Sequence, residues 1–172
     1  MKKLVPLAAT AMFALCSVTG AQAMGVSVEA GMSSESTMVY RLGLQWDFNK
    51  SWWQTDTGRL TGYWDAGYTY WNGKDRSTVH SLSLSPMFVY EFNGDSVKPY
   101  IEAGIGIAGF SETSYEGRDF GSAFAFEDRI GAGLRFADGQ QVGIRASHYS
   151  NAGIKQPNDG LESITLHYRT SF

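Results

Sequence analysis

A histidine, a serine and a glutamate near the end of the chain form a pattern that could hydrolyse an ester. His148 and Ser150 are two residues apart, and Glu162 follows twelve residues after the serine. A serine hydroxyl is a weak nucleophile until a base takes its proton, and histidine is the side chain suited to this near neutral pH. A carboxylate can then orient the imidazole and stabilise its protonated form. The pattern therefore predicts Ser150 as nucleophile, His148 as general base and Glu162 as the orienting acid.

These three residues lie on segments in which apolar and polar residues alternate with a period of two, as in a β-strand. In 141–150 the apolar face carries His148 and Ser150, and in 161–172 it carries Glu162. Consecutive segments of this kind pair as neighbouring strands. We therefore expect the three side chains to meet on one patch of the apolar face.

An ester hydrolase also needs donors for the negative oxygen that forms when the serine attacks. The loop after Ser150 offers Asn151, Gly153 and Asn158 as side-chain and backbone donors. The alternative is that His148 and Ser150 belong to a rim of polar residues without catalytic function. Spacing alone leaves both interpretations open.

From residue 24 onward the chain divides into eight alternating segments, separated by turn residues and without helical periodicity. Most are 12 to 15 residues long, whereas an ordinary strand has about five or six. Strands of this length could cross a bilayer when tilted. The segments cover 24–32, 36–48, 59–71, 79–92, 98–110, 122–136, 141–150 and 161–172.

The two faces of these segments indicate the surroundings of the strands. Glutamates and arginines lie opposite the apolar face, and tryptophans and tyrosines gather near segment ends, as in the aromatic girdles of membrane barrels. We therefore predict an all-β fold, an eight-stranded antiparallel transmembrane β-barrel with a polar interior. The alternative is a soluble lipocalin-like barrel, whose apolar faces would turn inward.

The first 23 residues have the pattern of an export signal. Lys2 and Lys3 precede an apolar run, and Ala21-Gln22-Ala23 ends it as a cleavage site. We expect residues 24–172 to form the mature chain as a single barrel domain. Cys16, the one cysteine, leaves with the signal, so the mature chain has neither a disulfide nor a thiol nucleophile; a lipoprotein signal at Cys16 is the alternative.

Composition excludes several partners and cofactors. Charged residues are 18% of the chain, the net charge is −3, and no block of Lys and Arg is long enough to follow a phosphate backbone, so we expect no nucleic-acid partner. Three scattered histidines give no zinc-binding spacing. We expect no metal and no other cofactor.

The lengths of the linkers predict how the barrel is oriented. An even-stranded outer-membrane barrel keeps both termini and its short turns in the periplasm and its longer loops outside. The linkers at 93–95 and 138–139 are short, whereas 111–121 and 151–160 are long and polar. The patch around Ser150 then lies at the outer rim. The linker 49–58 is longer than a periplasmic turn needs, and the sequence provides no reason for it.

The stretch from His148 to Gly160, HYSNAGIKQPNDG, followed by Glu162, resembles the signature of the lipid A 3-O-deacylases of Gram-negative outer membranes. The segments SWWQ at 51–54, GYWDAG at 62–67 and FEDRIG at 126–131 are also similar to that family. The resemblance covers essentially the whole mature chain. It implies an eight-stranded barrel that hydrolyses the ester of the 3-hydroxyacyl chain at position 3 of lipid A.

Carried onto this sequence, the resemblance implies a triad of Ser150, His148 and Glu162, with Asn151 assisting the oxyanion and Asn158 as a weaker match. It implies lipid A of lipopolysaccharide as substrate and the bacterial outer membrane as location, with the site facing the outer leaflet. A homodimer is left open. The alternative function is a non-enzymatic structural or adhesive barrel in which the triad pattern is coincidental.

Asp128 is the residue that the alternation makes difficult to place. The period puts it on the lipid face of 122–136, where an unpaired carboxylate is costly. The turn at 138–139 sets Asp128 opposite His148 or Ser150, on the side away from Glu162. It could then support His148 or bind a substrate hydroxyl. The alternative is a β-bulge within 122–128 that turns Asp128 into the barrel interior.

Overall fold

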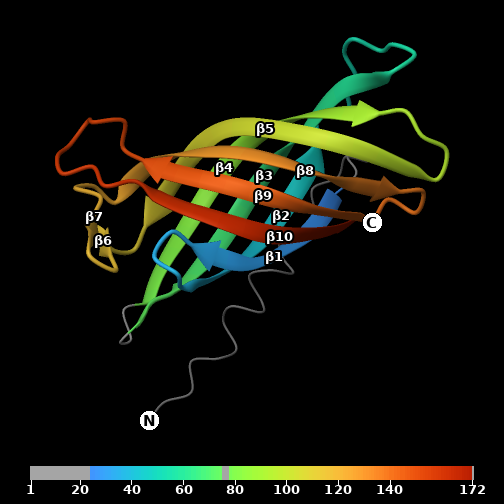
Figure 1. Cartoon of the computed structure of the whole chain (residues 1–172). Coiled ribbons are helices and arrows are strands. Elements are labelled where there is room, and N and C mark those ends of the chain that lie inside the picture. The colour runs from blue at the N-terminus through green and yellow to red at the C-terminus, as the bar shows by residue number, and fades with distance from the viewer. Residues whose placement is uncertain (1–23, 75–77, 172) are drawn as a thin grey trace.

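The computed structural model describes residues 24–74 and 78–171, so the predicted signal at 1–23 and the terminal Phe172 lie outside the described residues. Within them, eight long strands close into one barrel, and a two-stranded hairpin lies in a loop (Figure 1). The long strands are β1 (Met24–Ser33), β2 (Met38–Asp47), β3 (Gly58–Asn72), β4 (Thr78–Phe92), β5 (Val97–Phe110), β8 (Phe124–Phe136), β9 (Gln141–Ser150) and β10 (Leu161–Ser171). The predicted eight-stranded fold is confirmed.

The barrel has a simple up-and-down topology. Each long strand pairs antiparallel with the next along the chain, and β1 closes the ring by pairing with β10. The hairpin, β6 (Ser114–Tyr115) and β7 (Arg118–Asp119), lies in the β5–β8 loop and was not predicted, because two-residue strands are too short to show alternation. In the described part of the chain, no helix is long and apolar enough to span a membrane.

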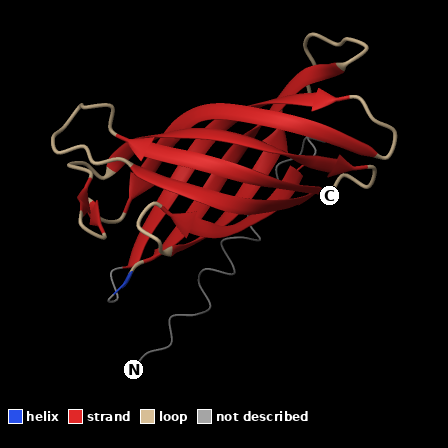
Figure 2. Cartoon of the chain, viewed as in Figure 1, coloured by secondary structure: helices blue, strands red, loops and turns tan. Residues whose placement is uncertain are grey.

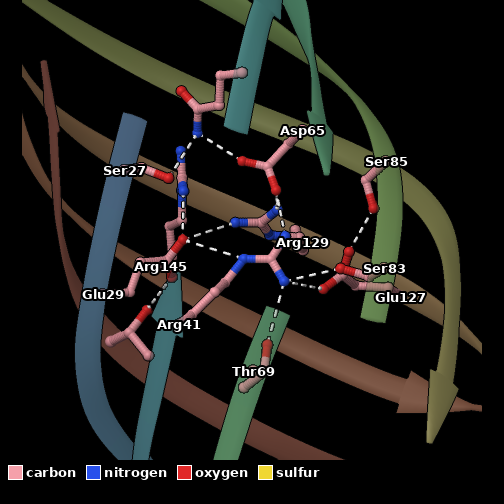
Figure 3. Close-up of polar contacts among 12 residues, drawn as sticks. Ser27, Glu29, Arg41, Asp65, Thr69, Ser83, Ser85, Glu127, Arg129 and Arg145 are labelled. Atoms are coloured by element: carbon pink, nitrogen blue, oxygen red, sulfur yellow. Dashed lines mark hydrogen bonds and ion pairs between the residues drawn. The ribbon is translucent and has the colours of Figure 1, made fainter. Parts of the chain in front are cut away.

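Polar side chains fill the interior of the barrel (Figure 3). Arg129 donates to Asp65 at 2.9 Å, and Arg145 forms an ion pair with Glu29 at 2.6 Å. Arg41 joins the same network by donating to Asp65. Each of these charges is buried and has an oppositely charged partner, which offsets the cost of removing it from water. An eight-stranded barrel filled in this way has no room for an aqueous channel.

Apolar side chains cover the outside of the barrel. Ile105, Ile130, Ile164 and Leu166 are each more than 60% exposed, on strands β5, β8 and β10. This distribution is the inverse of a soluble barrel and is favourable only where lipid replaces water. The lipocalin-like alternative is therefore wrong.

The two long loops that follow β5 and β9 lie together at one end of the barrel (Figure 2). The turns after β4 and β8 are short and lie at the end where β10 finishes, whereas the β5–β8 and β9–β10 loops extend from the opposite end. With the topology of such barrels, the long loops face outside the cell and the short turns face the periplasm. The predicted orientation places the end of β9 at the outer rim.

The long connection between β2 and β3 folds back along the outside of the barrel. Phe48 donates its backbone N–H to Gly62 at 2.9 Å, and Trp52 forms a β-bridge with Leu60. The rings of Phe48 and Trp52 also pack against Phe88 on β4. The extra residues therefore continue the strand pairing beyond β2, which is why this connection is longer than a tight turn.

Candidate active site

His148 and Glu162 face each other across neighbouring strands on the outside of the barrel. The register of β9 and β10 pairs the two residues directly, and Nδ1 of His148 lies 2.9 Å from Oε1 of Glu162. An ionised carboxylate can only accept, so Nδ1 carries the proton and Nε2 is left as a base. Both side chains are almost half exposed. The pair has the arrangement of the base and acid of a hydrolytic triad.

Ser150 lies two residues beyond His148 on the same face of β9. Between them, Tyr149 points into the barrel and donates from its hydroxyl to Glu127 at 2.7 Å, which holds this end of β9 to the buried network. Within the described residues, no hydrogen bond joins Oγ of Ser150 to His148. Such contacts are often long without substrate and shorten when it binds.

Asp128 lies on the other side of His148. The register of β8 and β9 pairs Asp128 with His148, and the pairing continues one-to-one from Phe126 to Arg135. The neighbours Glu127 and Arg129 are buried in the interior, so Asp128 points outward. The β-bulge alternative is therefore wrong. His148 has a carboxylate as its cross-strand neighbour on both sides.

An apolar groove of about 570 Å³ runs from this patch over the outer surface of β5, β8, β9 and β10. The small residues Gly104 and Ala146 line it, and isoleucines at neighbouring positions form its sides. At this outward patch the lining includes His148, Glu162 and Asp128. A groove of this composition can hold an alkyl chain beside the histidine.

The two asparagines of the β9–β10 loop differ in their hydrogen bonds. The buried Asn151 donates from Nδ2 to the carbonyl oxygens of Phe120 and Lys155, at 2.7 and 2.8 Å. Its backbone N–H donates to Oδ1 of Asn158 at 2.8 Å. These bonds use the donors of Asn151 to hold the loop, whereas Nδ2 of Asn158 has no partner among the described residues. Asn158 is the amide that is free to donate.

The hairpin in the β5–β8 loop supports the β9–β10 loop from the side. Asp119 donates its backbone N–H to the carboxylate of Asp159, and the backbone N–H of Asp159 donates to the carbonyl of Asp119, both at 3.0 Å. Arg118 also forms an ion pair with Glu35 in the β1–β2 turn at 2.7 Å. The hairpin therefore links the segment that follows Ser150 to the β1–β2 turn, which lies far from it in the sequence.

The sequence matches the family model described as lipid A 3-O-deacylase (PagL) over residues 38–171. The chain belongs to the PagL family. It is 63% identical to the lipid A deacylase PagL of Pseudomonas aeruginosa, over 98% of both chains, and 38% identical to that of Bordetella bronchiseptica, over 100% of this chain and 98% of the relative. A crystal structure of the outer membrane enzyme PagL is 65% identical and superposes with a TM-score of 0.81, covering 84% of this chain and 97% of that one.

Membership of the PagL family confirms the resemblance indicated by the HYSN stretch. The closed barrel agrees with the fold of the PagL crystal structure. The structure brings Ser150, His148, Glu162 and Asp128 to one outward patch. It places Gly153 in an exposed turn with a φ of 77°.

Gly160 is a site residue that sequence reasoning missed in this PagL-family chain. A β-carbon at this position would lie 2.7 Å from Cε1 of His148 and 3.1 Å from Oε1 of Glu162. The absence of a side chain therefore lets the loop pack directly on the histidine–glutamate pair. No pattern of spacing identifies such a glycine, because the contact depends on how the loop returns to β10.

Replacing Gly160 with Ala should lower turnover about tenfold to a hundredfold and leave the barrel folded. The added methyl displaces the imidazole, and small misplacements of a catalytic group are costly. Turnover on purified lipid A measures the effect, and heat-modifiable gel mobility reports folding. Gly109→Ala is the matched control, because a β-carbon there meets nothing within 4 Å. Equal turnover of the two variants would exclude a positioning role for Gly160.

Proposed function

We propose that this chain is an outer-membrane serine esterase that removes the 3-O-acyl chain from lipid A of lipopolysaccharide. The observation that carries the proposal is the 2.9 Å contact between His148 and Glu162 on the outward face, beside Ser150 and an apolar groove. A structural or adhesive barrel has no need for this arrangement facing lipid. The PagL family to which the chain belongs is described as lipid A 3-O-deacylases.

The reaction follows from the positions of the three side chains. Oγ of Ser150 attacks the ester carbonyl carbon while Nε2 of His148 takes the hydroxyl proton, and Glu162 stabilises the resulting imidazolium. The tetrahedral intermediate then releases the sugar oxygen, which receives the proton from His148. Water attacks the acyl-enzyme with His148 again as base, which frees the fatty acid and restores Ser150.

The oxyanion of each tetrahedral intermediate needs a donor that is already in place. Asn158 supports this role because its Oδ1 is held by the backbone N–H of Asn151, which leaves Nδ2 free. Asn151 then acts by positioning the loop, and Gly153 offers a backbone N–H in the same turn. This assignment reverses the order of the two asparagines expected from the sequence.

The groove and Asp128 suggest how the substrate is selected. An acyl chain that lies along the groove passes Asp128, which lines it opposite His148. A hydroxyl on the third carbon of that chain lies close to the scissile ester and could donate to the carboxylate. Asp128 would then favour 3-hydroxyacyl chains over unsubstituted ones, because an unsubstituted chain would cover the carboxylate without offering it a donor.

Mass spectrometry of lipid A from cells with and without the protein tests the proposed function. Loss of one ester-linked 3-hydroxyacyl chain at position 3 is expected in cells that carry it. Lipid A of unchanged mass, in membranes that contain the folded barrel, would instead favour the structural or adhesive alternative. Loss of a chain from another position would keep the esterase but overturn the site of hydrolysis.

Asn158→Ala should lower kcat about a hundredfold with little change in KM. The oxyanion exists only along the reaction path, so its donor stabilises the transition state more than the bound substrate. Steady-state turnover on one lipid A preparation measures both constants. Asn72→Ala, at the exposed end of β3, is the control. An unchanged kcat in Asn158→Ala would assign the oxyanion to other donors.

A further inference from the structure

Two polar cavities adjoin at the periplasmic end of the barrel, opposite the catalytic patch. They measure about 290 and 300 Å³, and both are lined by Arg59 and Arg135. The first is also lined by Lys50 and Ser51 from the long β2–β3 connection. Neither cavity shares a residue with the groove beside His148.

Positive charge exceeds negative charge around these cavities. Arg59, Arg135 and Lys98 converge on the single carboxylate of Glu91, with nitrogen–oxygen distances of 3.0, 2.8 and 3.8 Å. One carboxylate cannot neutralise three cations, and Glu91 is itself buried behind them. This excess is notable in a chain whose net charge is −3.

The remaining acids do not remove the excess. Asp47 lines the first cavity but forms an ion pair with Arg169 at 2.9 Å. Asp95 lines the second cavity only. Gln141, with its amide oxygen turned toward them, accepts from both Arg135 and Arg169 but carries no charge. The first cavity therefore keeps a positive character.

Hydrogen-bond donors also exceed acceptors in the first cavity. Ser51 already accepts from Nη1 of Arg59 at 3.2 Å, so its own hydroxyl proton is left to donate. Lys50 lines the cavity, and its Nζ has no partner among the described residues. A site rich in cationic donors and poor in acceptors is matched by an oxyanion, which only accepts.

The long β2–β3 connection builds the wall of this cavity. The hydroxyl of Thr61 donates to the carbonyl of Lys50 at 2.9 Å, which ties the loop to β3. A two-residue turn between β2 and β3 would supply neither Lys50 nor Ser51. The additional residues of this connection therefore contribute two of the donors that line the cavity.

We propose that the cavity lined by Lys50, Arg59 and Arg135 binds a small soluble oxyanion, carrying a phosphate or carboxylate group, on the periplasmic side. The strand side chains that line it, Arg59, Tyr63 and Arg135, alternate with the lipid-facing positions of β3 and β8, so the cavity belongs to the inward side of the sheet. Its volume suits one small anion and is far below that of a lipid with its chains. A lipid headgroup is the competing source of the same chemistry.

Calorimetric titration of the folded barrel in neutral detergent tests the proposal, with inorganic pyrophosphate and succinate as probes. Saturable one-to-one binding of at least one probe is expected, with a Kd of about 1 mM or tighter. Lys50→Gln and Arg59→Gln should each weaken it about tenfold or more. Lys155→Gln, which changes an exposed cation at the opposite end, should leave the Kd unchanged.

Two controls separate a loss of binding from a loss of folding. The Lys50 side chain contacts no other residue by a hydrogen bond or ion pair in the described structure, so the barrel should fold normally in Lys50→Gln. Heat-modifiable gel mobility checks that Arg59→Gln is folded. Absence of saturation with both probes, or equal weakening by Lys155→Gln, would overturn the proposal. Loss of probe binding when phosphatidylglycerol is added to the micelles would assign the site to a lipid headgroup and overturn a soluble ligand.

Discussion

Replacing Ser150 with Ala, or His148 with Asn, should lower lipid A deacylation about a thousandfold or more while the barrel still folds. Ser150→Ala removes the nucleophile, and His148→Asn removes the base that activates it, so either change stops the same step. Because the two residues act as a unit, the double variant should be scarcely slower than either single one.

The barrel should tolerate both changes because neither side chain belongs to the buried network. His148 is almost half exposed and, within the described residues, is hydrogen-bonded only to Glu162. Tyr149, which does hold β9 to the interior, is left in place. Folding is measured by heat-modifiable gel mobility and turnover by release of the hydroxy fatty acid.

Matched controls for these variants are available on the same barrel. His80→Asn changes another half-buried histidine on an outward position of β4, and Ser96→Ala changes an exposed serine in the β4–β5 turn. Both should keep wild-type turnover. Near-normal activity of folded Ser150→Ala would rule out the serine-esterase mechanism.

Replacing each of the two acids beside His148 with its amide should lower turnover to different extents. Glu162→Gln is expected to lower turnover about a hundredfold or more, because it removes the charge that favours the imidazolium at 2.9 Å. Asp128→Asn should cost about tenfold, because Asp128 is a cross-strand neighbour of His148 but, in the described structure, not its hydrogen-bond partner. Turnover of both folded variants on one lipid A preparation compares them.

The substrate can separate the two roles further. If Asp128 binds the acyl hydroxyl, the penalty of Asp128→Asn should disappear on a substrate whose chain lacks that hydroxyl, whereas the penalty of Glu162→Gln should persist. A larger loss in Asp128→Asn than in Glu162→Gln would reverse the assignment of the triad acid. Wild-type turnover of Asp128→Asn on both substrates would leave Asp128 without a role in the reaction.

The barrel and the composition of the patch could be predicted because both depend on local periodicity. A strand places every second side chain on one face, so the alternation in 141–150 put His148 and Ser150 together on the apolar face. The same period in 161–172 put Glu162 on that face. The pairing of consecutive strands then followed from antiparallel topology, and the structure reproduces it with His148 opposite Glu162.

The orientation of Asp128 was open at the sequence level because a bulge is a property of two strands. One extra residue in 122–128 would have left its composition almost unchanged while reversing which face each side chain occupies. Only the observed one-to-one pairing of β8 with β9 decides that Asp128 lies outside, beside His148.

The loops mark the limit of what periodicity determines. By itself the sequence determined that the chain forms a polar-lined barrel of eight strands and that serine, histidine and glutamate share its outer face, since these depend on residues two apart. The tertiary structure alone decided that Asn151 anchors the loop while Asn158 keeps a free donor, and that Gly160 packs on His148. Those contacts join residues through the path of an irregular backbone, which no repeating pattern specifies.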